Sequence, residues 1–156
     1  MDEILGIVSR RYCEDSDTHS DIATIAAFRA LQDAAIEPRE VDAIIYCGIT
    51  GGNTEPGTAP VIQSNLGAFN AVCTDVTNAC HGFCDGLFFG DLLIKGGAEH
   101  VLVVTAELSR VARSALAEIQ RARRFSELEK MLGGLTVGDS AGAFILGADE
   151  IGRAHV

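Results

Sequence analysis

The stretch that decides the fold is AVCTDVTNACHGFCDG, residues 71–86. Its first part, Ala71–Val76, is typical of a strand, and Cys80–Lys95 reads as one long helix that the glycine pair at 96–97 ends. Cys80 therefore lies where a strand ends and a helix begins. There the unpaired N–H groups of the first helical turn and the helix dipole favour a thiolate over a thiol. That placement suits acyl transfer through a thioester, although a cysteine that opens a helix is more often structural.

Strands and helices alternate on both sides of this stretch. Helical spacing of apolar residues predicts a helix over Thr18–Ala35, with Ser20 or Thr18 as N-cap, and a short helix over Thr58–Leu66 that Gly67 stops. Leu108–Leu132 has a polar, helical pattern. Apolar, β-branched runs predict further strands at 43–50, 100–106 and 141–146. The alternation predicts an α/β fold with a mostly parallel sheet.

The helix predicted after Cys80 is unusually rich in apolar residues and glycine. Apolar residues lie on most sides of this helix, which predicts that the helix is central and buried. Gly82, Gly86 and Gly90 fall at i, i+4 and i+8, although each glycine costs about 1 kcal/mol relative to alanine in a helix. The stripe predicts close approach of another helix's backbone; chance is the alternative.

Length, composition and charge limit the kinds of protein that this sequence can encode. The 156 residues suit a single domain, 47% are hydrophobic, and the net charge of -10 speaks against nucleic acid as a partner. The basic cluster of Arg121, Arg123 and Arg124 lies among acids and reads as a solvated helix face. No apolar run reaches the roughly 18 residues of a membrane span, so we expect no membrane association and a cytoplasmic location. The five cysteines are odd in number and irregularly spaced, which predicts thiols and neither disulfides nor a metal site.

The sequence resembles β-ketoacyl-acyl-carrier-protein synthase III and its relatives in the thiolase superfamily. The nucleophile motif of that family, a small residue followed by A-C-x-G-F, reads NACHGF at residues 78–83. LTVGDSAGAFILG is similar to the phrase FGDGAGA that closes the first half of that fold. The resemblance covers nearly the whole chain apart from Val111–Met131. The other stretches that agree in order are SDIATIAAFRAL, VDAIIYCGIT and TAPVIQSNLGAFNAVCTDVTNAC.

The resemblance implies a thiolase-like fold, of which residues 1–156 form the N-terminal half as one partial domain, and a Claisen condensation of the fatty-acid or polyketide type. Cys80 would accept the acyl group of an acyl-CoA or acyl carrier protein, and a decarboxylated malonyl thioester would then attack it. The His and Asn that donate to the thioester oxygen in the family would lie beyond Val156, so this chain alone is expected to be inactive in condensation. His81 could tune the Cys80 thiol or contact the pocket. No cofactor and no metal are implied.

Three departures from the family bear on this interpretation. Glu55 stands where family members often place an apolar gate into the partner subunit's acyl pocket; it would line a polar pocket or lie on a solvated loop. The early Trp and Arg that grip CoA have no evident counterpart. The opening strand is expected in the middle of the sheet, between Val41–Cys47 and Val101–Ala106. Either Glu3–Val8 replaces it or the chain is a fragment, which the sequence favours.

Three hypotheses on function stay open. The first is a condensing enzyme that forms a homo-oligomer or pairs with a second-half chain. The second is an acyltransferase of the same fold that transfers the Cys80 acyl group without condensation. The third is a non-catalytic subunit or fragment that needs a complementary chain.

Overall fold

The computed structural model describes residues 6–49, 55–110 and 136–148, together with four single positions, Arg121, Arg124, Ser126 and Gly133. Most of the helix predicted over Leu108–Leu132, including Arg123 of the basic cluster, lies outside the described residues. The chain divides into two compact units. One comprises Met1–Asp15 and Leu108–Ser140, and the other Ser16–Glu107 and Ala141–Val156.

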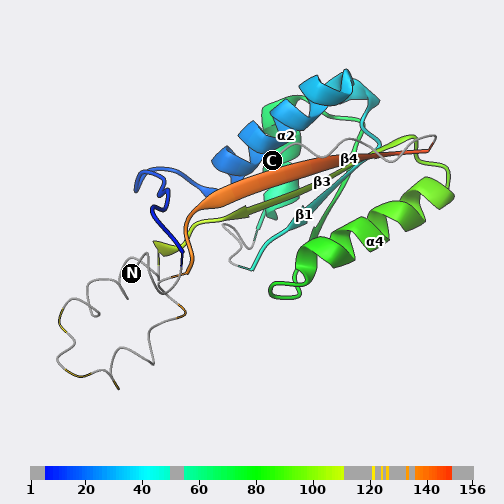
Figure 1. Cartoon of the computed structure of the whole chain (residues 1–156). Helices are drawn as coiled ribbons and strands as arrows, with labels where there is room; N and C mark the ends of the chain where they lie inside the picture. Colours follow the sequence, from blue (N-terminus) through cyan, green and yellow to red (C-terminus); the bar gives the residue numbers. More distant parts are fainter. Residues whose placement is uncertain are drawn as a thin grey trace. The chain divides into compact units, whose positions relative to one another are not determined.

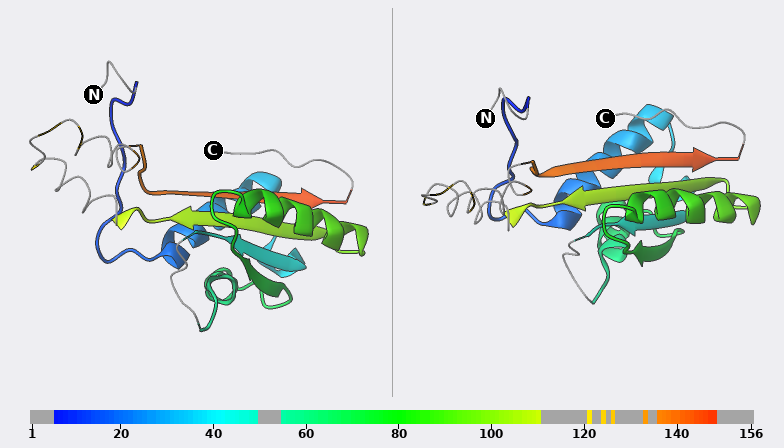
Figure 2. Two further views of the ribbon diagram at one scale, coloured as in Figure 1. Left: turned by 90° about the horizontal axis from the view of Figure 1, so that it is seen from below. Right: turned by 60° about the horizontal axis from the view of Figure 1, so that its bottom comes forward.

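The second unit contains a four-stranded sheet in the order β2-β1-β3-β4. The strands are β1 (Ala43–Cys47), β2 (Val72–Val76), β3 (His100–Glu107) and β4 (Ser140–Gly147). The central strand β1 is parallel to both neighbours, with Ala43 opposite Val72 on β2 and opposite Val101 on β3. β4 runs against β3, as the opposed arrowheads in Figure 2 show. The predicted α/β fold with a mostly parallel sheet is confirmed.

Helices cover both faces of this sheet (Figure 1). α2 (His19–Ala34) and α3 (Thr58–Leu66) lie on one face, and α4 (Gly82–Lys95) lies on the other. Side chains of successive strand residues point to opposite faces, so each strand supplies both layers of the core. The layer under α2 and α3 contains Leu31, Ile62, Ile44, Leu102 and Val104, and the layer under α4 contains Ala43, Ile45, Cys47, Val101 and Val103.

The ends of the first two helices follow the predicted local chemistry. Thr18 is the N-cap of α2; its side chain accepts from Asp21 N at 3.2 Å, and Thr18 N donates to Asp21 Oδ2 at 2.9 Å. This reciprocal capping box satisfies backbone groups that the first helical turn leaves unpaired. Gly67, with φ of 73°, ends α3 in the left-handed region, where glycine carries no side-chain penalty.

The expected place of the opening strand is wrong. β1 and β3 pair directly from Ala43–Val101 to Tyr46–Val104, so no strand lies between them. The central position therefore leaves no unpaired edge inside the core. With β1 and β3 paired, the sheet needs neither Glu3–Val8 nor another segment between these two strands.

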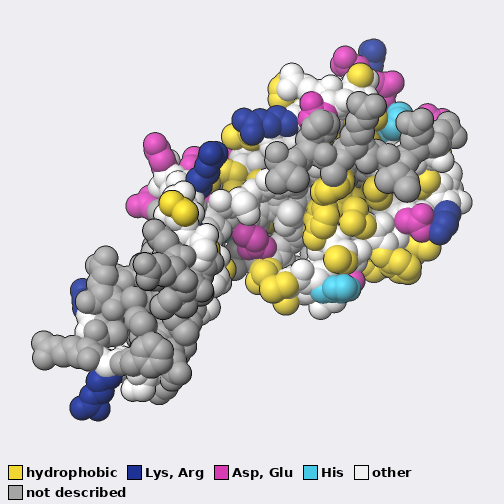
Figure 3. All heavy atoms as spheres, viewed as in Figure 1, with side chains coloured by type: hydrophobic (Ala, Val, Ile, Leu, Met, Phe, Trp, Pro, Cys, Tyr) yellow, Lys and Arg dark blue, Asp and Glu magenta, His cyan; other side chains and the backbone are white. Residues whose placement is uncertain are grey.

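The expected neighbour of the glycine stripe is also wrong, because Gly82, Gly86 and Gly90 face the sheet and not another helix. A Cβ at Gly90 would lie 2.5 Å from Leu146 Cδ1 and 3.4 Å from Val101 Cγ1. The missing side chains let α4 rest directly on the strands. The opposite face of α4 is exposed in this chain, with Phe88 60% and Leu92 48% exposed, and hydrophobic side chains gather along it in Figure 3. The predicted burial of this helix holds for one face.

The first unit is held by the carboxylate of Asp139, in the GDSAGA stretch. Asp139 Oδ2 accepts from Cys13 N at 2.7 Å, and Oδ1 accepts from Ser109 N at 2.6 Å. Asp139 N donates to Arg11 O at 2.9 Å. One buried side chain thus joins three segments that are far apart in the sequence.

Candidate active site

Cys80 lies in a tight turn between β2 and α4. His81 N donates to Asn78 O at 3.0 Å, and Gly82 N donates to Ala79 O at 3.1 Å. Ala79 has φ of 45°, a left-handed conformation that an L-residue adopts at a cost of about 1–2 kcal/mol. The helix begins at Gly82, two residues later than the sequence predicted, so Cys80 precedes the N-cap residue His81. The Cys80 side chain is exposed.

A carboxylate on α4 contacts both ends of this turn. Asn78 Nδ2 donates to Asp85 Oδ2 at 2.7 Å, and His81 Nε2 lies 3.6 Å from Asp85 Oδ1. His81 is therefore placed beside Cys80 in sequence but is directed to Asp85. Asn78 was expected only as the small residue that opens the NACHGF motif, and Asp85 was not predicted to belong to the site. The spacing of four between His81 and Asp85 is the signal that could have found the pair, because such residues are neighbours on a helix surface.

Phe83 anchors the start of α4 to the sheet. Its ring lies 5.3 Å from the ring of Phe144 on β4, centroid to centroid, and its side chain packs against the core layer under α4. On the other side of the turn, Thr77 Oγ1 donates to Gly48 O at 3.4 Å, just past the end of β1. The nucleophile turn is thus connected to β1 and β4 by its flanks.

Glu55 precedes α3, and its side chain is exposed. The start of α3 is fixed by Asp75 on β2, whose carboxylate accepts from Thr58 N at 2.6 Å and from Ala59 N at 2.8 Å. A carboxylate at this place satisfies unpaired N–H groups and complements the helix dipole. Asp75, which the sequence analysis did not single out, therefore ties the segment that follows Glu55 to the strand that leads to Cys80.

The five cysteines differ in environment, and all lie in the described residues without a disulfide. Cys80 and Cys84 are exposed. Cys47 is buried on β1, and burial, reinforced by the nearby Asp85 and Asp75 carboxylates, raises the pKa of its thiol to about 11. Burial also raises the pKa of Cys73. The predicted burial is confirmed for Cys47, whereas Cys73 is only half-buried.

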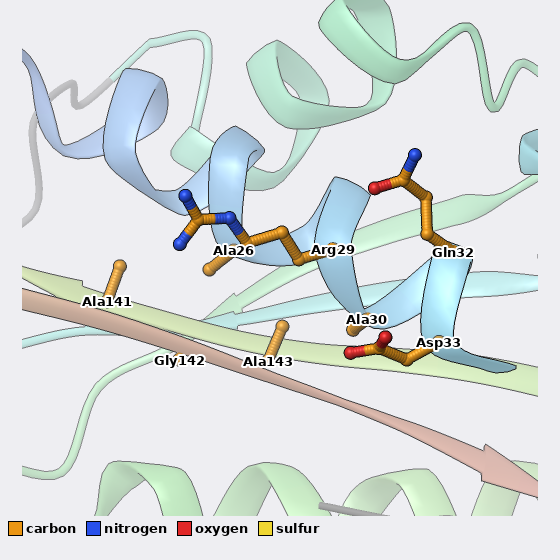
Figure 4. A pocket seen from close by; sticks show the side chains of 8 residues that line it. All are labelled: Ala26, Arg29, Ala30, Gln32, Asp33, Ala141, Gly142 and Ala143. Carbon is orange, nitrogen blue, oxygen red and sulfur yellow. The ribbon is translucent and has the colours of Figure 1, made fainter. Parts of the chain in front are cut away.

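A cleft of about 330 Å³ lies between α2 and β4, lined among others by Arg29, Asp33 and Gly142 (Figure 4). Arg29 and Asp33 extend from α2 beside the small residues of β4. This cleft opens on the α2 face of the sheet, whereas Cys80 begins the connection to α4 on the other face. It is therefore separate from the candidate nucleophile.

The described residues contain neither a candidate metal site nor a candidate membrane-spanning helix. Among the described residues, no three His, Cys, Asp or Glu side chains are arranged to hold a metal ion. Within the same part of the chain, none of the helices is long and apolar enough to cross a bilayer.

Comparison with known proteins identifies relatives over the whole chain. Residues 74–156 match the family model of 3-oxoacyl-[acyl-carrier-protein (ACP)] synthase III. A β-ketoacyl-[acyl-carrier-protein] synthase III of Caldanaerobacter subterraneus is 41% identical over 108 residues, covering 68% of this chain and 33% of that protein. A synthase III of Streptomyces coelicolor is 36% identical over 150 residues, covering 95% of this chain and 41% of that protein.

The fold is similar to that of OleA from Xanthomonas campestris. One crystal structure of an OleA variant matches with a TM-score of 0.84 and 28% identity, covering 94% of this chain and 46% of OleA. Another OleA variant, solved with bound lauric acid and lauroyl-CoA, also matches with a TM-score of 0.84. OleA structures with substituted glutamate, cysteine or histidine and with bound cerulenin match similarly.

This chain thus spans between a third and a half of the length of these relatives. The matched family model covers the strand, turn and helix around Cys80 and extends through β4. The chain has a thiolase-like fold and belongs to the 3-oxoacyl-[acyl-carrier-protein] synthase III family.

Proposed function

We propose that Cys80 is the acyl-accepting nucleophile of a condensing enzyme. The observation that carries the proposal is the position of Cys80: an exposed thiol in a constrained turn before α4, in the NACHGF motif, within the segment that matches the family model. The buried Cys47 and half-buried Cys73 are poorer nucleophiles at neutral pH because burial raises their pKa.

The first step is formation of a thioester on the chain. The Cys80 thiolate attacks the carbonyl carbon of an acyl-CoA or acyl carrier protein thioester. The new carbon–sulfur bond forms as the bond to the carrier's sulfur breaks, and the carrier leaves as a thiolate that takes up a proton. Lauroyl-CoA is a suitable first donor to test, since an OleA variant is known with this molecule bound.

The second step is a decarboxylative condensation. A malonyl thioester loses carbon dioxide, and its carbanion attacks the carbonyl carbon of the Cys80 thioester. The Cys80 thiolate leaves, and a β-ketoacyl thioester forms. Donors that stabilise the developing oxyanion, which the resemblance assigns to a His and an Asn, complete this step. No cofactor is needed, and we propose a cytoplasmic location for the enzyme.

Glu55 is the second residue that we assign to the substrate pocket. It is exposed, it precedes a helix that Asp75 ties to β2, and it precedes Cys80 by nearly the same number of residues as separate the substituted glutamate from the substituted cysteine in OleA. A carboxylate there makes the pocket polar at one point. The side chain of His81 is directed to Asp85, so His81 acts on Cys80 through the turn to which both residues belong.

Intact-mass analysis tests the proposal. The purified chain is incubated with lauroyl-CoA, shorter acyl-CoAs and acyl carrier proteins, and the adduct is located by peptide mapping. We expect one acyl group on Cys80, no adduct in Cys80→Ser, and an unchanged adduct in the control Cys84→Ser, since Cys84 is the other exposed cysteine and lies in the first turn of α4. An adduct on another cysteine, or none with any donor, would overturn the assignment.

The same preparation separates the alternatives. Addition of a malonyl thioester to the acylated protein gives a β-ketoacyl product if the protein condenses. Loss of the acyl group to an added alcohol or amine, with no such product, indicates an acyltransferase. A chain that accepts no acyl group but binds a complementary chain is the non-catalytic subunit of the third hypothesis.

A further inference from the structure

The turn that carries Cys80 is held from both ends by one side chain. Asn78, the first residue of the turn, donates from Nδ2 to Asp85 Oδ2 at 2.7 Å. His81, the last, places Nε2 3.6 Å from the other carboxylate oxygen, Oδ1. Cys80 lies between these two residues. A rearrangement of the turn that moves Asn78 away from Asp85 breaks the 2.7 Å hydrogen bond between them.

Neither burial nor side-chain capping holds the turn. The residues from Thr77 to His81 are all exposed, so burial does not fix them. His81 is the N-cap residue of α4, yet its side chain accepts no capping hydrogen bond from the backbone N–H groups of the first turn. Ala79 adopts a left-handed conformation, which persists only where the surroundings enforce it. Two backbone hydrogen bonds and the Asp85 contacts provide that enforcement.

Asp85 itself has a rigid base. Its N–H donates to His81 O at 3.1 Å, which sets the first turn of α4. The next residue, Gly86, lies so close to the sheet that a Cβ would reach within 3.0 Å of Val103 Cγ1. The position of the Asp85 backbone is therefore set by the packing of α4 on β1 and β3.

We propose that Asp85 is a positioning residue for Cys80, holding the nucleophile turn through Asn78 and His81 at the angle that acyl transfer requires. The inference rests on the proposed role of Cys80. Asp85 acts by geometry, because a carboxylate near a thiol disfavours the thiolate. Loss of Asp85 should therefore slow attack on a bound thioester, which depends on orientation, without slowing reaction with a small diffusing reagent.

The test compares these two reactions in the same variants. The rate of lauroyl transfer from lauroyl-CoA to Cys80 is measured by intact mass, and alkylation by iodoacetamide at each cysteine is measured by peptide mapping. The variants are Asp85→Ala, Asn78→Ala and Asp85→Asn. The control is Asp91→Ala, which removes an acid of the same helix that pairs with Lys95, one turn or more away from the nucleophile turn.

We expect lauroyl transfer to fall about tenfold in Asp85→Ala and in Asn78→Ala. The ratio of alkylation at Cys80 to alkylation at Cys84 should rise in both, because the turn is freed. The charge removed in Asp85→Ala lies beside Cys84 as well, so Asn78→Ala, which keeps that charge, measures the effect of the turn alone. Asp85→Asn should keep lauroyl transfer within about threefold of the parent, since its amide oxygen still accepts from Asn78. Asp91→Ala should match the parent in both reactions.

Equal lauroyl transfer in the parent and Asp85→Ala would overturn the proposal, as would an equal fall in Asp91→Ala. Labelling of the buried Cys47 reports unfolding. If Cys47 is labelled in Asp85→Ala, the test of the proposal rests on Asn78→Ala, which leaves α4 unchanged. If the parent accepts no lauroyl group, the proposed function fails, but the alkylation ratio still tests Asp85. An unchanged ratio in Asp85→Ala and Asn78→Ala then refutes its positioning role.

Discussion

Gly86 on α4 lies so close to Cys47 on β1 that a Cβ at position 86 would overlap the cysteine Sγ. The same Cβ would lie 3.0 Å from Val103 Cγ1 and 3.6 Å from Ile45 Cγ2. These three atoms belong to adjacent strands, β1 and β3. The contact sets the height of α4 above the sheet and, through the first helical turn, the position of the turn with Cys80.

Gly86→Ala is therefore expected to destabilise the chain, although alanine is the better helix former by about 1 kcal/mol. Insertion of a methyl group into a close-packed core typically costs about 1–3 kcal/mol, so we expect a net loss of about 1 kcal/mol or more in the free energy of unfolding, measured by urea denaturation. The matched control is Gly82→Ala, whose Cβ would meet nothing closer than Val76 O at 3.7 Å. Equal stability of the two variants would contradict this account of the packing.

The secondary structure was predictable because its signals are local. The capping box at Thr18, the stop at Gly67 and the β-branched run before Cys47 each depend on neighbouring residues alone. The glycine stripe was misinterpreted for the opposite reason. Spacing shows that Gly82, Gly86 and Gly90 share a face, but whether a strand or a helix approaches that face depends on tertiary packing.

The same distinction holds at the candidate site. The position of Cys80 between a strand and a helix was predictable because the signals for both elements are contiguous, while its role as nucleophile stays a prediction. The order of the strands was not, since pairing of β1 with β3 joins residues nearly 60 positions apart, and the expected place of the opening strand was wrong. Asp75 on β2 holds the start of α3, 16 and 17 positions earlier in the chain, and no local pattern encodes that contact. The spacing of four between His81 and Asp85, in contrast, is a local signal.

Alkylation should separate the thiols by environment. With iodoacetamide at pH 7.5, we expect Cys80 to react first. Cys47 should stay unlabelled from pH 7 to 9, because it is 1% exposed and its pKa of about 11 keeps it protonated there. Peptide mapping of a time course provides the rates, with Cys84, which is exposed in the first turn of α4, as the reference. Earlier labelling at Cys47, Cys73 or Cys13 would contradict the assignment of the reactive thiol.

Asp42 should contribute to stability above pH 4 and lose that contribution in acid. Its Oδ2 accepts from Glu99 N at 2.7 Å and from His100 N at 3.0 Å, at the start of β3, and these hydrogen bonds lower the pKa of the carboxyl below its usual 3.8. A depressed pKa means that the folded state favours the carboxylate, so the stabilisation is lost as the pH falls through the folded-state pKa.

Asp42→Asn tests this dependence. The amide presents N–H donors where the native group only accepts, so we expect a lower free energy of unfolding than the parent at pH 7 and a smaller difference at pH 3. Urea denaturation at both pH values measures the two differences, with Asp91→Asn as a control for an exposed acid of α4. A difference that grows in acid would show that the carboxylate is not the stabilising form.

The outer face of α4 should drive association of the chain. Phe88, Phe89, Leu92 and Leu93 are between 41% and 60% exposed, and they form one apolar surface on the side of the helix away from the sheet. Soluble monomers rarely expose a continuous apolar surface of more than a few hundred Å². We expect the purified chain to be an oligomer by light scattering, or to bind the dye ANS strongly.

The double variant Phe88→Lys and Leu92→Lys should reduce both association and ANS binding, whereas Phe28→Lys, at a 51% exposed position on α2, should not. Equal association in the two variants would place the contact elsewhere, with the β2 edge at the 73% exposed Val72 as the next surface to change. A monodisperse monomer that does not bind ANS would mean that α4 is covered in solution, and the association predicted from its exposed face would be wrong.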